Sequence, residues 1–232
     1  MKQVFITNIL IFGAMLVTIA LVSADGWGSD AGAREPVKLP HPELDGKCSL
    51  EKALQQRRSV REYSSEALTL AEVSQLLWAA QGITSRYGYR TAPSAGALFP
   101  LELYLVAGNV DSLPAGVYRY DPHGHQLLRV ADGEHRIALT AAALNQTCVR
   151  NAPAVIVLAA VYERTTGKYR DRGIRYVHME AGHAAQNVHL EAVSLKLATV
   201  VIGAFYDEKV QKILGLSSDE APLIIMPVGK RR

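Results

Sequence analysis

The sequence predicts one α+β domain that follows an N-terminal apolar segment. Two kinds of pattern predict this fold class: segments whose apolar residues recur at helical spacing, and β-rich runs bounded by turn residues. The chain of 232 residues, with 49% apolar and 20% charged residues, has the composition of a globular domain with one sizeable core. Its formal net charge of +3 and lack of like-charge tracts argue against a nucleic-acid-coating surface, so no nucleic-acid partner is expected.

The N-terminus is typical of a targeting segment. Lys2 is the only charge before an apolar run from Val4 to Val22, and small residues follow at a cleavage-like position. This pattern predicts a secretory signal peptide over residues 1–24. Because the run approaches the ~20 apolar residues that span a bilayer, an uncleaved anchor through residues 4–22 is the alternative. We therefore expect a protein that is exported, to the periplasm or the cell exterior, or anchored in the membrane.

Residues 25–47 are rich in Gly, Pro and Asp and lack periodicity. They predict a linker that wraps the surface of a folded domain over residues 48–232. The chain has two cysteines, Cys48 and Cys148. In an exported protein they can form a disulfide, but a single pair far apart in sequence does not reveal its pairing. A disulfide and two free thiols both stay open.

Two helices are predicted at the start of the domain. Ser49 is a good N-cap for a helix that reaches Arg57. Ser49–Lys52 also matches the S-x-x-K motif of serine acylases, but the S-D-N and K-T-G partners of that motif are missing, so a cap explains Ser49. Thr69–Glu72 is a capping box, and apolar residues then repeat at helical spacing to about Gln81.

Strands and helices follow one another in the rest of the domain. Alternation, or an apolar run of strand length, predicts strands at Leu101–Ala107, Ala154–Val161, Ala198–Ile202 and Leu223–Val228, and a hairpin with arms at Val117–Tyr120 and Gln126–Val130. Helical spacing predicts two further helices, at Ile137–Leu144 and Arg175–Lys196. Ala and Gly recur along the longer of these two, so another helix can pack closely against it.

Two short segments have the composition of a ligand site. Three guanidiniums and a hydroxyl lie within Arg57–Arg61, and arginine presents a planar fork of donors that matches phosphate oxygens. Thr91–Pro100 contains small residues that let the backbone approach a flat ligand, and Ser94 adds a donor. Taken alone, a solvated basic turn and a plain Gly/Pro turn explain the same residues.

Lys168 and Tyr169 are the candidate proton-transfer residues. They are predicted at the end of a polar loop, directly before Arg170. A lysine near a cationic, partly buried site can act as a base, and a tyrosine can donate or relay a proton. A solvated lysine and a packing tyrosine are the alternative. Glu180–His183 is a Glu-x-x-His, but the second copy that a di-iron site needs is not evident, so no metal site is expected.

These segments, in this order, resemble the nitroreductase-like FMN flavoproteins, and more narrowly the SagB/ThcOx-type dehydrogenase branch. The resemblance covers roughly Leu39 to Gly229 and implies a central, mostly antiparallel sheet flanked by helices, in a dimer. Two positions depart from the usual pattern of the branch. Phe99 stands where most members have Tyr, and Ser194–Leu197 lacks the Gly that relatives carry before the strand.

The resemblance implies a set of site residues. Lys168 and Tyr169 would remove a proton from the substrate. The residues implied to bind FMN are Arg57, Arg58, Ser59, Arg61, Pro93, Ser94, Ala95, Gly96, Ile202, Gly203, Ala204, Lys230 and Arg231.

The leading hypothesis is therefore an FMN-dependent oxidoreductase that transfers hydride through the flavin N5. Its substrate would be a small molecule or a peptide, and its implied assembly is a homodimer. An NAD(P)H-dependent nitro or quinone reductase is one alternative. An exported flavin-binding module without turnover is the other.

Overall fold

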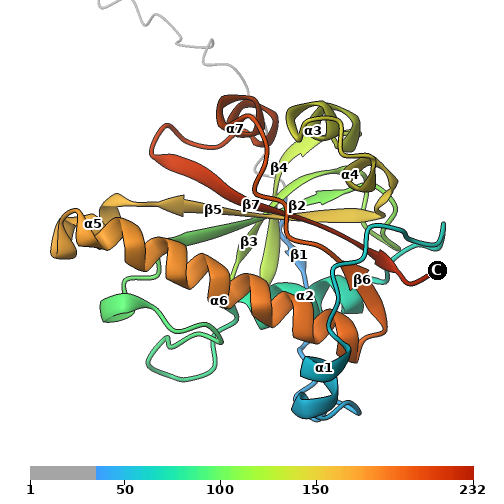
Figure 1. The fold of residues 1–232 in the computed structure, drawn as a ribbon, viewed down its shortest axis with the longest axis horizontal. Coiled ribbons are helices and arrows are strands. Elements are labelled where there is room, and N and C mark those ends of the chain that lie inside the picture. Colours follow the sequence, from blue (N-terminus) through green and yellow to red (C-terminus); the bar gives the residue numbers. More distant parts are fainter. Residues whose placement is uncertain (1–34) are drawn as a thin grey trace, which may run out of the picture. The chain divides into compact units, whose positions relative to one another are not determined.

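A seven-stranded antiparallel sheet forms the centre of the domain (Figure 1). The computed structural model describes residues 35–232, and the strand order is β1-β4-β3-β2-β5-β7-β6. The strands are β1 (Val37–Lys38), β2 (Leu101–Ala107), β3 (Gly116–Asp121), β4 (Gln126–Asp132), β5 (Ala154–Val161), β6 (Leu197–Thr199) and β7 (Glu220–Lys230). Each neighbouring pair is antiparallel, which confirms the predicted α+β class and the mostly antiparallel sheet.

Helices cover both faces of this sheet. The helices are α1 (Leu50–Gln56), α2 (Leu70–Gln81), α3 (Arg136–Ala142), α4 (Thr147–Asn151), α5 (Glu163–Tyr169), α6 (Arg172–Ser194) and α7 (Asp207–Leu214), with a 3-10 turn η1 at Ala95–Ala97. One apolar core lies between the sheet and α2 and α6, and a second lies between the opposite face and α3, α4 and α7. Because β5 is buried along its whole length between these cores, its sequence is a continuous apolar run.

Local signals predicted several elements well. The capping box is present at α2, where Thr69 and Glu72 bond each other's backbone, and the helix ends at Gln81 as expected. The long helix α6 begins three residues before the predicted Arg175 and ends two before Lys196. Lys196 itself has a φ of 60°, a left-handed conformation that favours glycine. This geometry would suit the glycine that the resemblance implies before the strand.

Other elements differ from the prediction. Strand β6 is shorter than the predicted Ala198–Ile202, and Ile202 pairs with Ile225 only as an isolated bridge. Strand β7 extends beyond both ends of the predicted Leu223–Val228. The prediction of a loop at Lys168–Tyr169 was wrong, because these residues form the last turn of α5. Neither α4 nor α5 was expected, since short polar helices carry no apolar period.

The segment before α1 contacts the sheet and α2. Strand β1 pairs with β4, and the Glu43 N–H donates to Gln75 Oε1 at 2.9 Å. Cys48 is half-buried, Cys148 is buried, and both are free thiols in the structure. No helix of residues 35–232 has the length and apolar character that a membrane crossing needs. The predicted targeting segment, residues 1–24, lies outside the described residues.

Candidate functional site

The segments singled out in the sequence form two clusters that lie apart along α6 (Figure 1). Near its N-terminus lie η1 and α5, which carry Pro93–Gly96 and Lys168–Tyr169. Near its C-terminus lie the end of α1, β6 and the C-terminal end of the chain, with Arg57–Arg61 and Lys230–Arg231. Ile202–Ala204 follow β6 and lie beside Ile225 of β7 and Gln146, toward the other face of the sheet, and we count them with the second group. We call these the proton-transfer cluster and the basic cluster. The two clusters do not lie a full helix length apart, because Ser94 interacts with Glu180 in the middle of α6 and Arg57 with His189, about nine residues or ~14 Å further along the helix.

Gly96 makes the closest approach within the proton-transfer cluster. A Cβ placed on Gly96 would lie 2.9 Å from Tyr169 Oη and 3.1 Å from Lys168 Nζ. Its φ of 64° is left-handed, which glycine adopts without strain. Ser94, two residues earlier, accepts a hydrogen bond at its Oγ from the Phe99 N–H at 2.9 Å and so holds the turn together.

Helix α5 holds Lys168 and Tyr169 against this turn. The Tyr169 ring packs edge-on against Tyr176 of α6, with centroids 5.1 Å apart. Four residues before Lys168, on the same helical face, Arg164 donates to the Phe99 carbonyl at 3.1 Å and to the Glu102 carboxylate at 2.6 Å. These contacts fix α5 to the turn, while Lys168 itself stays exposed.

The backbone is strained on both sides of the proton-transfer cluster. Ala97 has a φ of 54° and Phe99 a φ of 45°, and neither is glycine. Arg170, which directly follows Tyr169, has a φ of 53° with a ψ of −144°, a region that is nearly restricted to glycine. Strained residues of this kind cluster at ligand and catalytic sites, because the surrounding fold must hold them in place.

Glu180 is a buried acid that was not predicted to take part in this cluster. It lies on α6, is 2% exposed, and its Oε1 has no partner in hydrogen-bonding geometry among the described residues. Burial raises the pKa of Glu180 to about 7, and the Ser94 hydroxyl and the Arg90 guanidinium only partly offset this rise. Its sequence signal was an acidic residue on the apolar stripe of α6, between Val177 and Ala184.

The basic cluster begins where α1 ends. Arg58 donates from Nη1 to the carbonyls of Gln55 and Arg57, at 3.0 and 2.6 Å, and so satisfies backbone oxygens at the end of the helix. The chain then runs beside β6, where the Val60 N–H donates to the Thr199 carbonyl at 3.0 Å. Ser59 is exposed on this stretch.

The arginines of the basic cluster do not converge on one point. Burial lowers the pKa of His189 on α6, and the positive charge of Arg57 lowers it further. Arg61 instead lies near Cys148 of α4, on the opposite face of the sheet. Burial raises the pKa of the Cys148 thiol, and the positive charge of Arg61 partly offsets this rise. A ligand that contacts Arg57 and Arg58 therefore does not automatically reach Arg61.

The other segments of the basic cluster differ in whether their hydrogen-bond donors already have partners. The backbone N–H groups of Gly203 and Ala204 have no partner among the described residues, and Gly203 has open space where a Cβ would stand. Arg231 is exposed and pairs through its backbone with Tyr63. Lys230 Nζ lies 3.7 Å from Glu72, so that amine is already partly neutralised.

No group of three or more potential metal ligands of the His, Cys, Asp or Glu type occurs within residues 35–232. His183 is exposed on α6 whereas Glu180 is buried, so the two ends of the Glu-x-x-His face different surroundings.

Comparison with known proteins gives consistent matches. Residues 54–230 match the sequence model of the nitroreductase family. A protein of Methanocaldococcus jannaschii that is named as a nitroreductase is 48% identical over 197 residues, which are 85% of this chain and 98% of that protein. The microcin B17-processing protein McbC of Escherichia coli is 32% identical over 146 residues, which are 60% of this chain and 54% of McbC.

A solved structure from Anabaena variabilis, also named as a nitroreductase, superimposes with a TM-score of 0.71 at 34% identity. The match covers 79% of this chain but only 38% of the Anabaena chain. The chain thus spans nearly the whole length of the archaeal relative. It spans about half of McbC and less than half of the Anabaena chain.

Proposed function

This chain belongs to the nitroreductase family of oxidoreductases, and we propose that it is an FMN-dependent enzyme of the SagB/ThcOx-type dehydrogenase branch. The observation that carries the proposal is the contact of Gly96 with Lys168 and Tyr169. It joins the segment expected to lie against a flavin with the two side chains expected to move a proton.

The basic cluster has the donors that a flavin mononucleotide requires. Arg57 and Arg58 supply charge for a phosphate, and the unpartnered N–H groups of Gly203 and Ala204 supply backbone donors beside open space. When bound, FMN would accept or donate a hydride at N5. The chain's own part would be to position the substrate and to hold its proton at Lys168 Nζ, with Tyr169 Oη as the relay.

A homodimer is part of the proposal, because the resemblance implies one and because the proton-transfer cluster and the basic cluster lie apart along α6 in a single chain. A second copy, related by a two-fold axis, could place its proton-transfer cluster against the basic cluster of the first. Exposed apolar side chains support such an interface: Leu50 and Leu54 on α1, and Ile174 and Met179 on α6.

Mixing two variants with complementary defects tests the shared site. Arg58→Ala weakens FMN binding by the basic cluster of one chain and is assayed at an FMN concentration that fills only the wild-type site, and Lys168→Ala removes the base from another chain. If each site combines two chains, a mixed dimer carries one intact site, and random mixing should restore about a quarter of the wild-type activity. If each site lies within one chain, the mixture stays inactive and the shared-site proposal is wrong.

A nitro or quinone reductase remains the second candidate, because the 48% identical archaeal relative is named as a nitroreductase. McbC, by its name, processes microcin B17, and this relationship supports a peptide substrate for the dehydrogenase alternative. Export or membrane attachment through residues 4–22 is also proposed, on the sequence pattern alone.

A further inference from the structure

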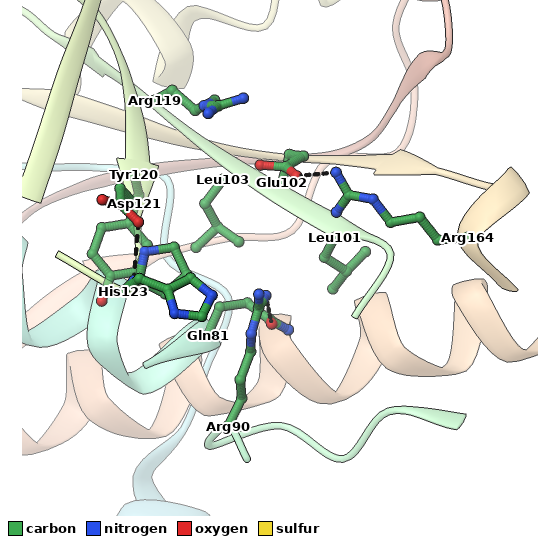
Figure 2. Close-up of a pocket in the computed structure, with 11 residues that line it drawn as sticks. Gln81, Arg90, Leu101, Glu102, Leu103, Arg119, Tyr120, Asp121, His123 and Arg164 are labelled. Carbon is green, nitrogen blue, oxygen red and sulfur yellow. Dashed lines mark hydrogen bonds and ion pairs between the residues drawn. The ribbon is translucent and has the colours of Figure 1, made fainter. Parts of the chain in front are cut away.

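A pocket of about 250 Å³ lies next to the proton-transfer cluster, between the loop before β2 and strands β2 and β3 (Figure 2). Polar and charged side chains dominate its lining, namely Gln81, Arg90, Glu102, Arg119, His123 and Arg164. Its volume is below the ~300–1,000 Å³ typical of pockets that enclose a whole ligand. The pocket is therefore suited to one end of a larger molecule.

Arg90 is the central cation of this pocket. Figure 2 shows its side chain rising from the loop toward Gln81, to whose Oε1 it donates at 2.8 Å. Its guanidinium carbon also lies 4.6 Å from the centroid of the Phe99 ring. Within residues 35–232 it forms no ion pair with a carboxylate, and burial lowers its pKa. Glu102 and Glu180 lie near enough to oppose this effect, but neither is bonded to Arg90, and a half-buried guanidinium without a bonded carboxylate is a favourable site for an anion.

A buried amide adds a second donor. Gln81 is 1% exposed, and its Nε2 has no partner in hydrogen-bonding geometry among the described residues, although the amide lies close enough to Glu180 to lower the pKa of that acid. Glu180 next to it compensates the charge of Arg90 only in part, because burial raises the pKa of this acid to about 7. An acceptor in the pocket would satisfy donors that the fold leaves open.

The charges of the lining indicate which anion fits. Arg164 is paired with Glu102 at 2.6 Å, and Asp121 accepts from Gln126 and from nearby backbone N–H groups. Three guanidiniums face two carboxylates, which leaves about one positive charge. This balance favours a monoanion, whereas a phosphate monoester carries about −1.5 to −2 at pH 7.

We propose that this pocket binds a carboxylate group of the substrate, with Arg90 supplying the opposing charge. Arg164 lines the pocket and lies one helical turn before Lys168 on α5. A substrate anchored by its carboxylate would thus extend toward the candidate base. This last step rests on the proposed function, whereas binding of the carboxylate does not.

Calorimetric titration of the purified protein, with and without FMN, tests the proposal. The probes are N-acetylalanine, its neutral amide, and inorganic phosphate at pH 7. We expect the acid to bind and the amide to bind at least tenfold more weakly, because the amide lacks the charge-assisted contacts. Equal binding of acid and amide, no binding of the acid at millimolar concentration, or tighter binding of phosphate would each overturn the proposal.

Variants locate the binding. Arg90→Gln should weaken binding of the acid about tenfold, because it removes the charge that faces the carboxylate. Arg119 lines the pocket from the other face of the sheet and makes no hydrogen bond or ion pair with the described residues, so Arg119→Gln should fold normally and weaken binding less. Arg86→Gln is the control, because Arg86 lies in the same loop but contacts Tyr87 outside the pocket. If Arg90→Gln folds like the wild type in a denaturation curve and binds the acid equally well, the pocket is not its site. Carboxylate binding by a protein that takes up no FMN would contradict the proposed function but not this inference.

Discussion

Gly96 lies directly against Lys168: a Cβ on the glycine would come within 3.1 Å of the lysine Nζ. The two residues belong to segments that the sequence marked for different roles, one for a flat ligand and one for proton transfer. Their contact places the base beside the ligand turn in a single chain, and it can be tested by adding that Cβ.

Gly96→Ala should lose turnover beyond its effect on stability. The left-handed φ should cost about 1 kcal/mol of unfolding free energy, and the new methyl should displace Lys168 and Tyr169. Gly133→Ala is the control, since Gly133 also has a positive φ but nothing within 4 Å of its Cβ position. Chemical denaturation should show similar losses in both variants, while only Gly96→Ala loses activity. Equal activity in the two would mean that the contact has no catalytic role.

Lys168→Ala should keep FMN and its reduction by dithionite. Oxidation of a peptide substrate should fall by a factor on the order of 10²–10⁴, the range for general acid–base catalysis. Tyr169→Phe should show a smaller loss. If both variants keep full activity in this assay, Lys168 is not the base. If the protein only reduces nitro or quinone compounds and both variants retain this activity, the result favours the reductase alternative over the dehydrogenase.

Arg57→Ala and Arg58→Ala should each weaken FMN binding by roughly 1.5–3 kcal/mol, about ten- to 150-fold, because each removes a charge-assisted contact. Arg58→Ala should also lower stability, since Arg58 binds two carbonyls at the end of α1. Fluorescence titration of the flavin gives both affinities, and Arg150→Ala on the exposed side of α4 is the control. Unchanged affinity in both variants would show that the phosphate lies elsewhere.

Glu180 should make stability depend on pH. Its pKa is about 7 in the fold against 4.5 ordinarily, so the folded state binds more protons between these values and stability falls as pH rises through this window. Glu180→Gln, which imitates the protonated acid, should match the wild type near pH 4 and exceed it by about 3 kcal/mol near pH 8. Denaturation curves across this range measure the difference. Glu208→Gln on α7 is an exposed control, and a pH-independent difference for Glu180→Gln would contradict the assignment.

Local sequence signals predicted the elements whose cause is local. The capping box of α2 and the apolar run of β5 are examples, because side chains within each segment determine the structure. Helix α5 was missed because its sequence has no apolar face. It is held by Thr165, which is buried, and by the bonds of Arg164 to a distant turn.

The candidate site could be predicted as a set of segments but not as an arrangement. Resemblance supplied Gly96 and Lys168 separately, and only the fold brings them together. The fold also places Arg57 and Arg61 near different faces of the sheet, although they are only four positions apart in the sequence. Arg90 and Gln81 had no signal, because a pocket between a loop and two strands leaves no period in the sequence.

The most direct test of the account is the absorbance spectrum of the purified protein, expressed without residues 1–24 and supplied with free FMN before gel filtration. We expect a yellow protein whose visible flavin bands disappear with dithionite and return in air, and which releases FMN when it is denatured. A colourless protein that takes up no FMN under these conditions would contradict the assignment of this chain as an FMN-dependent oxidoreductase.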